Sequence, residues 1–503
     1  MPTKVNIIGA GIAGLSAGCY LQMNGCETEI FEMHNLPGGL CTSWERGEYT
    51  IDGCLHWVVG SAPSDPFYKL WNELIDMKQM QFVDSDEYFR VEDEQGRVLT
   101  GFTNVNLLEM ELLEKAPEDK DLITDFIASI RKLDRLKMPV DTPQELMTFF
   151  DGVKMLKKFF PYVGTLNKWN KITAGEYADR CRNPLLKRFF EVAFLPEMSM
   201  LFIIFSFVWM NRKSAGYPVG GSLNFARQIE KRYLELGGKI HYHQKINTII
   251  TGQKNDQMMA TGVLTGKGEI KSSDYVISAA DAHSTIFNLL EGKYIDEKIK
   301  YYFRKLGVFP SLVKVSLGVN RRLDGLPRMV YFPLDKPLVI DPSVNFDYLG
   351  YFIHSMDPTL APEGKTLITV VFDTWHYDYW ERLRATDKEK YDAEKRRIAD
   401  EVITALDKKL GGIKEYLEMV DVSSPATIIR YTHNWKGSFE GWLMNKESGL
   451  KSLRKTLPGL RQFYLCGQWM EPGGGVPAAL MSGRNVAQII CKKEGIKFKT
   501  QSF

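Results

Sequence analysis

Residues 3–32, TKVNIIGAGIAGLSAGCYLQMNGCETEIFE, decide the fold of this chain. The short apolar run 4–8 predicts a buried strand, and three glycines follow it before a helical pattern begins at 13–22. A second strand is predicted at 28–31, and Glu32 stands at its end, where an acidic side chain can accept hydrogen bonds from a ribose. Strand, glycine turn, helix, strand and acid in this order predict a dinucleotide site.

The three glycines of the turn have the spacing GxGxxG, and each is needed for a different reason. Gly9 permits the tight turn, Gly11 lets the backbone approach a pyrophosphate, and Gly14 lets the helix pack closely on the strand. The first helical amides, at Ile12 and Ala13, offer partial positive charge to the phosphates. An ordinary turn without a ligand is the alternative, but the flanking strands and helix favour the dinucleotide site.

A second glycine pair favours FAD over NAD. The segment HNLPGGLCTSW (34–44) follows the second strand and contains Gly38, Gly39, Leu40 and Cys41. A second close approach of the backbone there suits a long cofactor, whose pyrophosphate and flavin both need room. We therefore expect these four residues to contact FAD.

The carboxy-terminal segment FYLCGQWMEPGGGVPAALMSGRNVAQII (463–490) predicts the other end of the cofactor site. It has the pattern of a strand, a glycine turn, a glycine-rich loop at 473–475 and a helix from about residue 477. The helix start would direct its amides at the flavin pyrimidine ring and stabilise negative charge on the reduced flavin. A disordered glycine linker is the alternative. The expected contacts are Gly467, Gln468, Gly475, Val476, Pro477 and Ala478.

These segments resemble the superfamily of FAD-dependent phytoene desaturases, carotenoid isomerases and retinol saturases, nearest its isomerase and saturase branch. The resemblance covers essentially the whole chain and also rests on YTIDGCLHWVVG (49–60), YPVGGSLNFARQIEKRYLELGGKI (217–240) and YVISAADAH (275–283). It implies an α/β fold: a Rossmann-like FAD-binding domain, as in amine-oxidase-like flavoproteins, with a discontinuous α+β substrate domain. It also implies an FAD-dependent oxidoreductase that desaturates, saturates or isomerises carbon–carbon bonds of a lipophilic polyene or isoprenoid, by hydride exchange with flavin N5.

Leu40 departs from the family pattern, because flavin amine oxidases and bacterial phytoene desaturases usually have arginine after the double glycine. This departure favours the saturase and isomerase branch. Two alternatives stay open: a flavin amine oxidase, and a non-enzymatic carrier of prenyl groups or other lipids with the same architecture. The carriers lose the flavin glycines, whereas this chain keeps them at both ends.

The resemblance also implies further residues beside the cofactor. DGCLHW runs beside the flavin in the family, so His56 is the candidate catalytic residue, with Trp57 next to it. An imidazole can donate or accept a proton near neutral pH, although a packed or cofactor-positioning histidine is the alternative. Ile246 is expected to contact the adenine through its backbone, or else to be an ordinary strand residue, and Ala279 is a further expected contact.

The domain order is predicted to be interrupted. The FAD-binding domain is expected to comprise 1–75, 215–290 and 455–503, and the substrate-binding domain 76–214 and 291–454. Capping-box patterns predict helix starts in the first substrate-domain stretch. They begin at Thr142 and Thr173.

Two stretches bear on how lipophilic the substrate is. Residues 189–210 are almost wholly apolar but interrupted by acidic residues and a proline, so they predict a buried helix that lines a tunnel or packs in the core, not a membrane span. Residues 154–171 interleave lysines with aromatic residues, which fits either a peripheral membrane contact or a solvated amphipathic surface. Trp57, Tyr431, Trp435 and Trp442 are candidates for the walls of a flat apolar site.

Composition narrows the function classes. Lys and Arg total 64 against 62 Asp and Glu, so nothing favours a nucleic-acid partner. The 8 histidines have no metal-ligand spacing, and we expect no metal. The 7 cysteines have no CxxC pair, and the first strand begins at residue 4, so we expect a reduced, cytoplasmic location, with membrane association as the alternative. The electron donor or acceptor is left open: NAD(P)H, a quinone, oxygen or a small redox protein.

Overall fold

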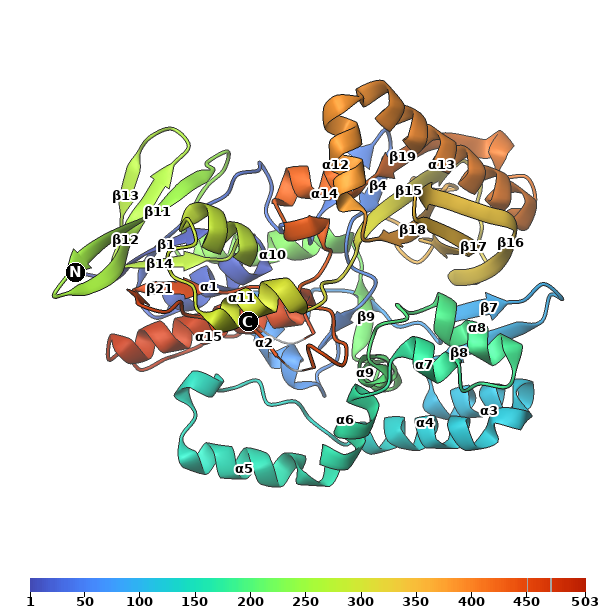
Figure 1. The fold of residues 1–503 in the computed structure, drawn as a ribbon, viewed down its shortest axis with the longest axis horizontal. Coiled ribbons are helices and arrows are strands. Elements are labelled where there is room, and N and C mark those ends of the chain that lie inside the picture. Colours follow the sequence, from blue (N-terminus) through green and yellow to red (C-terminus); the bar gives the residue numbers. More distant parts are fainter. Residues whose placement is uncertain (450, 471–472) are drawn as a thin grey trace.

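The computed structural model describes residues 1–449, 451–470 and 473–503. Its central parallel sheet takes strands from three separate stretches of the chain (Figure 1). Their order is β10 (Lys239–His241), β2 (Glu27–Phe31), β1 (Lys4–Ile8), β14 (Tyr275–Ser278) and β21 (Phe463–Leu465). All neighbouring pairs are parallel, so their carboxyl ends meet at one edge, where α/β folds bind their ligands.

Helices and a small, mostly antiparallel sheet pack around this central sheet. The helices are α1 (Ile12–Met23), α2 (Pro66–Leu74), α10 (Gly221–Glu235) and α15 (Gly475–Lys493). In the small sheet β11 (Ile246–Lys254), β12 (Gln257–Thr265) and β13 (Ile270–Ser272) pair antiparallel, and β20 (Leu460–Arg461) pairs parallel with β12. Glycine makes the helix contacts close: a Cβ on Gly483 of α15 would lie 2.4 Å from the carbonyl oxygen of Ala13 in α1.

A second sheet, of seven strands, forms the other half of the molecule (Figure 1). Its order is β19 (Leu417–Ser423), β15 (Ser311–Val319), β18 (Thr366–Thr374), β17 (Val344–Ile353), β16 (Met329–Asp341), β7 (Glu87–Glu92) and β8 (Val98–Phe102). The hairpin β7–β8 thus comes from one stretch of sequence and the other five strands from another. Helices α12 (Tyr377–Thr386), α13 (Lys388–Leu410) and α14 (Pro425–Thr432) pack beside it.

A helical layer packs against the β7–β8 hairpin. It contains α3 (Val105–Lys115), α4 (Lys120–Leu133), α6 (Val163–Asn170), α7 (Ala174–Ala178), α8 (Pro184–Val192) and α9 (Met200–Asn211). Two small sheets are also present: one of β3 (Ser43–Arg46) and β4 (Tyr49–Asp52), and one of β5 (Val58–Val59), β9 (Ala215–Pro218) and β6 (Phe82–Val83). The remaining helices are α5 (Phe149–Phe159) and α11 (Glu297–Lys305). Helix α5 stands apart from the layers at the lower edge of the view (Figure 1).

The two predicted capping boxes have different outcomes. The box at Thr173 is confirmed, because its hydroxyl accepts from the backbone N–H of Glu176 and α7 begins there. The helix predicted at Thr142 is wrong: only a short 3-10 turn forms at 144–146. The helix α5 begins later, because Thr148 forms a capping box with Asp151 instead.

Candidate functional site

One cavity of about 2,500 Å³ begins at the carboxyl edge of the central sheet and continues along the second sheet. Gly9, which follows β1, lines one end, whereas Tyr331 of β16 and Phe372 of β18 line the other. Ordinary small-molecule pockets measure about 300–1,000 Å³. The cavity therefore has room for a dinucleotide and a second large molecule.

Residues predicted to contact the cofactor come together in this cavity. Those that line it are Gly9, Gly11, Ile12, Ala13, Glu32, Gly38, Gly39, Leu40, Cys41, His56, Trp57, Ile246, Ala279, Gly467, Gln468, Gly475, Val476, Pro477 and Ala478. Gly14 instead lies behind the lining, where a Cβ would stand 2.1 Å from the carbonyl oxygen of Gly9. Its place therefore fits the close packing of α1 on the turn and not a contact with the ligand.

The two amino-terminal glycine segments are in direct backbone contact with each other. Gly11 and Gly38 form a parallel β-bridge, and a Cβ on Gly39 would lie 3.5 Å from the Cα of Gly11. Gly11 is also the N-cap of α1, and it has no side chain to bond the first helical amides. These amides remain available for an anion such as a pyrophosphate.

Glu32 is held in place by backbone amides. Its two carboxylate oxygens accept hydrogen bonds of 2.8 Å from the N–H groups of Ala10 and His34, and the side chain lines the cavity. A carboxylate has about four acceptor positions, so capacity remains for ribose hydroxyls. The structure thus orients the acid that the sequence singled out.

The carboxy-terminal glycines open the opposite side of the cavity. Gly474 is the N-cap of α15 with φ 56° and ψ −152°, a conformation that is essentially restricted to glycine. Among the described residues no side chain caps this helix, and its first residues line the cavity, so their amides can face a ligand there. A Cβ on Gly467, with φ 121°, would project into open space. In the described part of the chain, the starts of α1 and α15 thus both lie on this cavity without a side-chain cap, which fits the binding of an extended anionic cofactor.

His56 projects into the same cavity from the loop after β4. Desolvation by the protein atoms around the imidazole, together with the positive charges of Lys314 and Arg328, lowers its pKa to about 4. Arg328 Nη2 also donates a 3.2 Å hydrogen bond to the backbone oxygen of His56. The imidazole is therefore neutral at neutral pH, whereas the sequence suggested a group that titrates there.

Sequence reasoning missed three charged side chains that line the cavity. Lys314 of β15 is buried and donates a hydrogen bond to the backbone oxygen of Asp52; burial lowers the pKa of its ammonium. Burial, with the charge of Glu197, raises the pKa of Asp373 to about 7, and burial raises that of Glu440 to about 8. The available signal was a charged residue within or directly after an apolar strand run, as in SLVKVSLGV and TLITVVFD.

The predicted aromatic wall is only half correct. Trp57 and Tyr431 line the cavity. Trp435 and Trp442 do not; they pack in the core around Trp469, with ring centroids 6.1 Å and 4.9 Å from it. Three tryptophan rings that pack together at tilted and edge-to-face angles bury apolar surface against each other, which explains the difference.

Within residues 1–449, 451–470 and 473–503, no cluster of His, Cys, Asp and Glu side chains has the arrangement of a metal site. His241 instead forms a 2.9 Å hydrogen bond with Glu29. No helix within these ranges is long and apolar enough to cross a lipid bilayer.

Comparison with known proteins identifies relatives over almost the whole chain. The model of the family described as flavin containing amine oxidoreductase matches residues 12–491. The chloroplastic prolycopene isomerase of Daucus carota is 24% identical over 98% of this chain and 81% of its own length. The 4,4'-diaponeurosporene oxygenase of Staphylococcus aureus (strain MW2) is 22% identical over 98% of this chain and 99% of its own.

Solved structures share the fold. A redesigned triple mutant of putrescine oxidase has a TM-score of 0.63 at 12% identity, covering 98% of this chain and 99% of that one. An oxidoreductase from Methanosarcina mazei has a TM-score of 0.60 at 17% identity, covering 96% and 100%. At these identities the similarity establishes the fold alone.

Proposed function

We propose that this chain, which belongs to the family of flavin containing amine oxidoreductases, acts on carbon–carbon bonds of a lipophilic polyene or isoprenoid. It is an FAD-dependent oxidoreductase with the amine-oxidase type of fold. The curated relatives include enzymes whose names specify polyenes, a prolycopene isomerase and a diaponeurosporene oxygenase. Within this class we propose a desaturase, isomerase or saturase of the phytoene desaturase and retinol saturase type.

The proposal rests mainly on the part of the cavity that lies beyond the expected cofactor contacts and is lined by apolar side chains of α9; we call this part the apolar branch. Helix α9 is apolar on all sides, and its Leu201, Phe202, Phe205 and Trp209 line this branch. Of the predicted apolar stretch 189–210, residues 200–210 belong to this helix, and their place on the cavity supports the tunnel interpretation over core packing alone. A long apolar wall gains most from a long apolar ligand, since burial contributes about 25 cal/mol per Å².

We propose that the two ends of the cavity bind different molecules. The predicted stretches 1–75, 215–290 and 455–503 would bind FAD, and 76–214 and 291–454 would bind the substrate. When bound, FAD supplies hydride exchange at N5. The protein holds the pyrophosphate at the start of α1, directs the α15 amides at the ring and keeps water away from the apolar branch. His56 is proposed to position the ring or substrate as a neutral imidazole.

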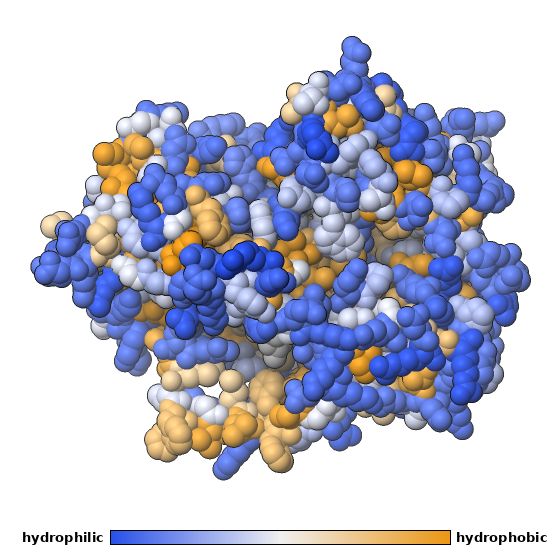
Figure 2. All heavy atoms as spheres, viewed as in Figure 1, coloured by the Kyte–Doolittle hydropathy of each residue, from blue (hydrophilic) through white to orange (hydrophobic). Residues whose placement is uncertain are grey.

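We also propose that the protein takes its substrate from a membrane surface. Helix α5 exposes Phe149 (81%) and Phe150 (75%), and Phe160, just after its end, is 75% exposed. Figure 2 shows hydrophobic side chains gathered over this helix. Leu156 and Phe159 of the same helix line the cavity, so the exposed face adjoins its entrance. Lysines on the helix would add attraction to anionic lipids. They are Lys154, Lys157 and Lys158.

Anaerobic mixing of the FAD-loaded protein with polyenes or amines tests the function. We expect a polyene to bleach the oxidised flavin, or reduced flavin to be reoxidised by one, while amines leave the absorption unchanged. Isomerisation without net bleaching is detected by chromatography of the polyene. Bleaching by amines alone would instead support an amine oxidase, and protein that never binds flavin would support a lipid carrier.

A further inference from the structure

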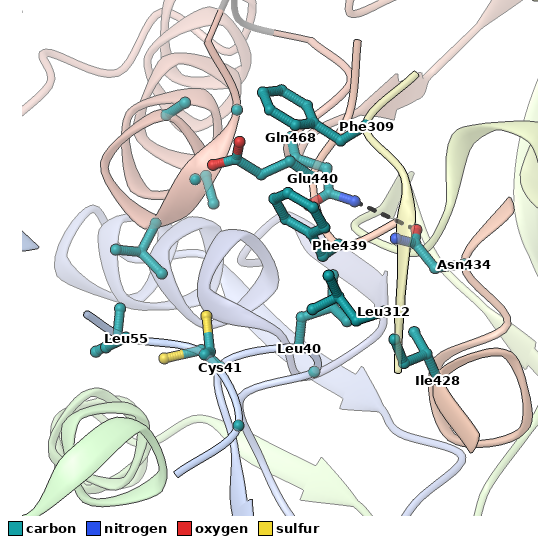
Figure 3. A pocket seen from close by; sticks show the side chains of 18 of the residues that line it. Leu40, Cys41, Leu55, Phe309, Leu312, Ile428, Asn434, Phe439, Glu440 and Gln468 are labelled. Carbon is teal, nitrogen blue, oxygen red and sulfur yellow. Dashed lines mark hydrogen bonds between the residues drawn. The ribbon is translucent and has the colours of Figure 1, made fainter. Parts of the chain in front are cut away.

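Glu440 has an unusual place in the site, because its carboxyl lies at the start of α15. A Cβ built on Gly475 would stand 3.0 Å from Glu440 Oε1, and one on Gly474 would stand 3.2 Å from its Cγ. Figure 3 shows the Glu440 side chain across the pocket from Leu40 and Cys41. The carboxyl therefore lies at the edge of the space assigned to the flavin ring, next to the amides directed at it.

Most side chains drawn around Glu440 in Figure 3 are apolar, and the amide of the neighbouring Gln468 donates a 3.3 Å hydrogen bond to Asn434. Phe309, Leu312 and Phe439 line the same part of the pocket (Figure 3). The neighbouring Ser438 does not bond the carboxyl: its Oγ donates a 2.6 Å hydrogen bond to the backbone carbonyl oxygen of Glu440. A carboxyl in such surroundings prefers its neutral form, and burial accordingly raises its pKa to about 8.

Charged side chains on the neighbouring elements do not offset this preference. They are Lys314 of β15, Asp281 after β14 and Lys455 before β21. Lys314 bonds to Asp52, Asp281 accepts from the backbone N–H groups of Ser284 and Trp435, and Lys455 pairs with Glu145 at 3.3 Å. Of the described residues, none is a cause of the raised pKa of Glu440, which comes from burial.

We propose that Glu440 is the residue that couples proton uptake to reduction of the bound cofactor. Transfer of a hydride (two electrons and one proton) to bound FAD would leave one negative charge beside the amides at the start of α15. An ionised Glu440 beside that charge is repelled, so its carboxylate takes one proton from solvent and becomes neutral. A protonated Glu440 already tolerates the charge and can donate a hydrogen bond to it.

This inference rests on FAD binding and not on the identity of the substrate. The test titrates the midpoint potential of the bound flavin against pH, with a chemical reductant and no polyene, in wild type and in Glu440→Gln. Glu447→Gln, which changes an exposed carboxyl seven residues further along the chain, is the matched control. If polyenes do not react but the titration gives the expected result, the proposed substrate is wrong and the role of Glu440 still holds.

We expect the wild type and Glu440→Gln to have the same slope of potential against pH well below pH 8. Above about pH 8, reduction of the wild type should take up one more proton per two electrons, so its midpoint potential should fall more steeply with pH. That proton is worth about 30 mV per pH unit, since a tenfold change in equilibrium constant is 29.6 mV for two electrons. Glu447→Gln should follow wild type. Parallel curves for wild type and Glu440→Gln over the whole range would overturn the proposal.

A second measurement needs no variant, in case Glu440→Gln folds poorly. Reduction of the wild-type flavin in weak buffer with a pH indicator counts the protons taken up. The count should rise by one as the pH passes from well below to just above about 8. A constant count across this range would also overturn the proposal.

Discussion

At the scale of single residues, Gly11 and Gly14 show how two glycines of one motif differ in their physical requirement. Gly11 has an ordinary φ of −68°, and the contact nearest a Cβ there would be the carbonyl oxygen of Gly38 at 3.9 Å. Gly14 has no such space, because a Cβ there would overlap the carbonyl oxygen of Gly9. The missing side chain of Gly11 therefore leaves space that a ligand can occupy, whereas that of Gly14 lets α1 pack against the turn.

Alanine substitutions should separate these two requirements. Gly11→Ala should keep its thermal unfolding temperature but bind FAD about a hundredfold more weakly, or roughly 2.8 kcal/mol, because the methyl group projects toward the pyrophosphate. Gly14→Ala should lose about 1–3 kcal/mol of stability through overpacking, although alanine is the better helix former. Calorimetry and quenching of flavin fluorescence measure the two effects. Equal loss of stability in both variants would refute the distinction.

Glu440 should also leave a signature in stability. Its pKa is about 8 in the folded protein against an ordinary 4.5, so the folded chain binds this proton more tightly than the unfolded chain does. The resulting stability is fully present below about pH 4.5 and is lost as the pH rises through about 8. Glu440→Gln removes this loss.

We therefore expect Glu440→Gln to gain thermal stability relative to wild type as the pH is raised from about 5 to about 9. Differential scanning calorimetry across this range measures the effect, with Glu447→Gln as the control. A difference between the two chains that does not change with pH would contradict the assignment.

At the scale of elements, α5 and α9 are both rich in apolar residues but have opposite environments. Helix α9 buries Leu201, Ile204 and Phe207 in the helical layer, whereas Phe149 and Phe150 of α5 face solvent. The apolar face of α5 is exposed because the helix stands away from the layers. An exposed aromatic face flanked by lysines is suited to the interface of a bilayer and not to a span.

Replacing Phe149 and Phe150 by serine should weaken membrane binding about tenfold or more, because both side chains would otherwise enter the interface. Co-sedimentation with vesicles containing anionic lipid measures this effect. Met110→Ser on α3, where the side chain is 67% exposed, is the matched control and should bind like wild type. Unchanged binding of the double variant would exclude α5 as the contact.

At the scale of the whole molecule, three distant stretches of chain must assemble before the cavity exists. A buried ion pair joins two of them: Arg484 of α15 lies 3.3 Å from Glu73 of α2, with side chains 5% and 0% exposed. Tyr20 of α1 donates a 2.6 Å hydrogen bond to the same carboxylate. The carboxy-terminal helix is thereby fastened to the amino-terminal part, which holds the two glycine turns opposite each other.

Arg484→Met should destabilise the protein by about 3–5 kcal/mol, because Glu73 is left as an unpaired buried charge. The double variant Glu73→Gln with Arg484→Met should recover part of that loss. Urea unfolding of the three chains measures both values. A double variant that is less stable than Arg484→Met alone would show that the pair acts in some other way.

The sequence predicted the local features of the site well and the long-range ones poorly. The glycine turns and Glu32 follow from φ requirements and strand order, which are local, and they line the cavity or pack behind it as their spacing indicates. Lys314 and Glu440 were missed because their importance depends on strands and loops that are far apart in sequence. Trp435 and Trp442 were misplaced for the same reason: the sequence pattern around an aromatic residue does not distinguish a cavity wall from a packed core.

We propose that the flavin ring lies where the amino-terminal and carboxy-terminal glycine turns meet, facing the apolar branch of the cavity. A crystal structure of the protein with bound FAD tests it most directly. We predict the pyrophosphate at the start of α1 and the ring between Leu40 and the first residues of α15, with Glu440 at its edge. A ring bound elsewhere, or a cavity closed by side chains when FAD is present, would contradict the account.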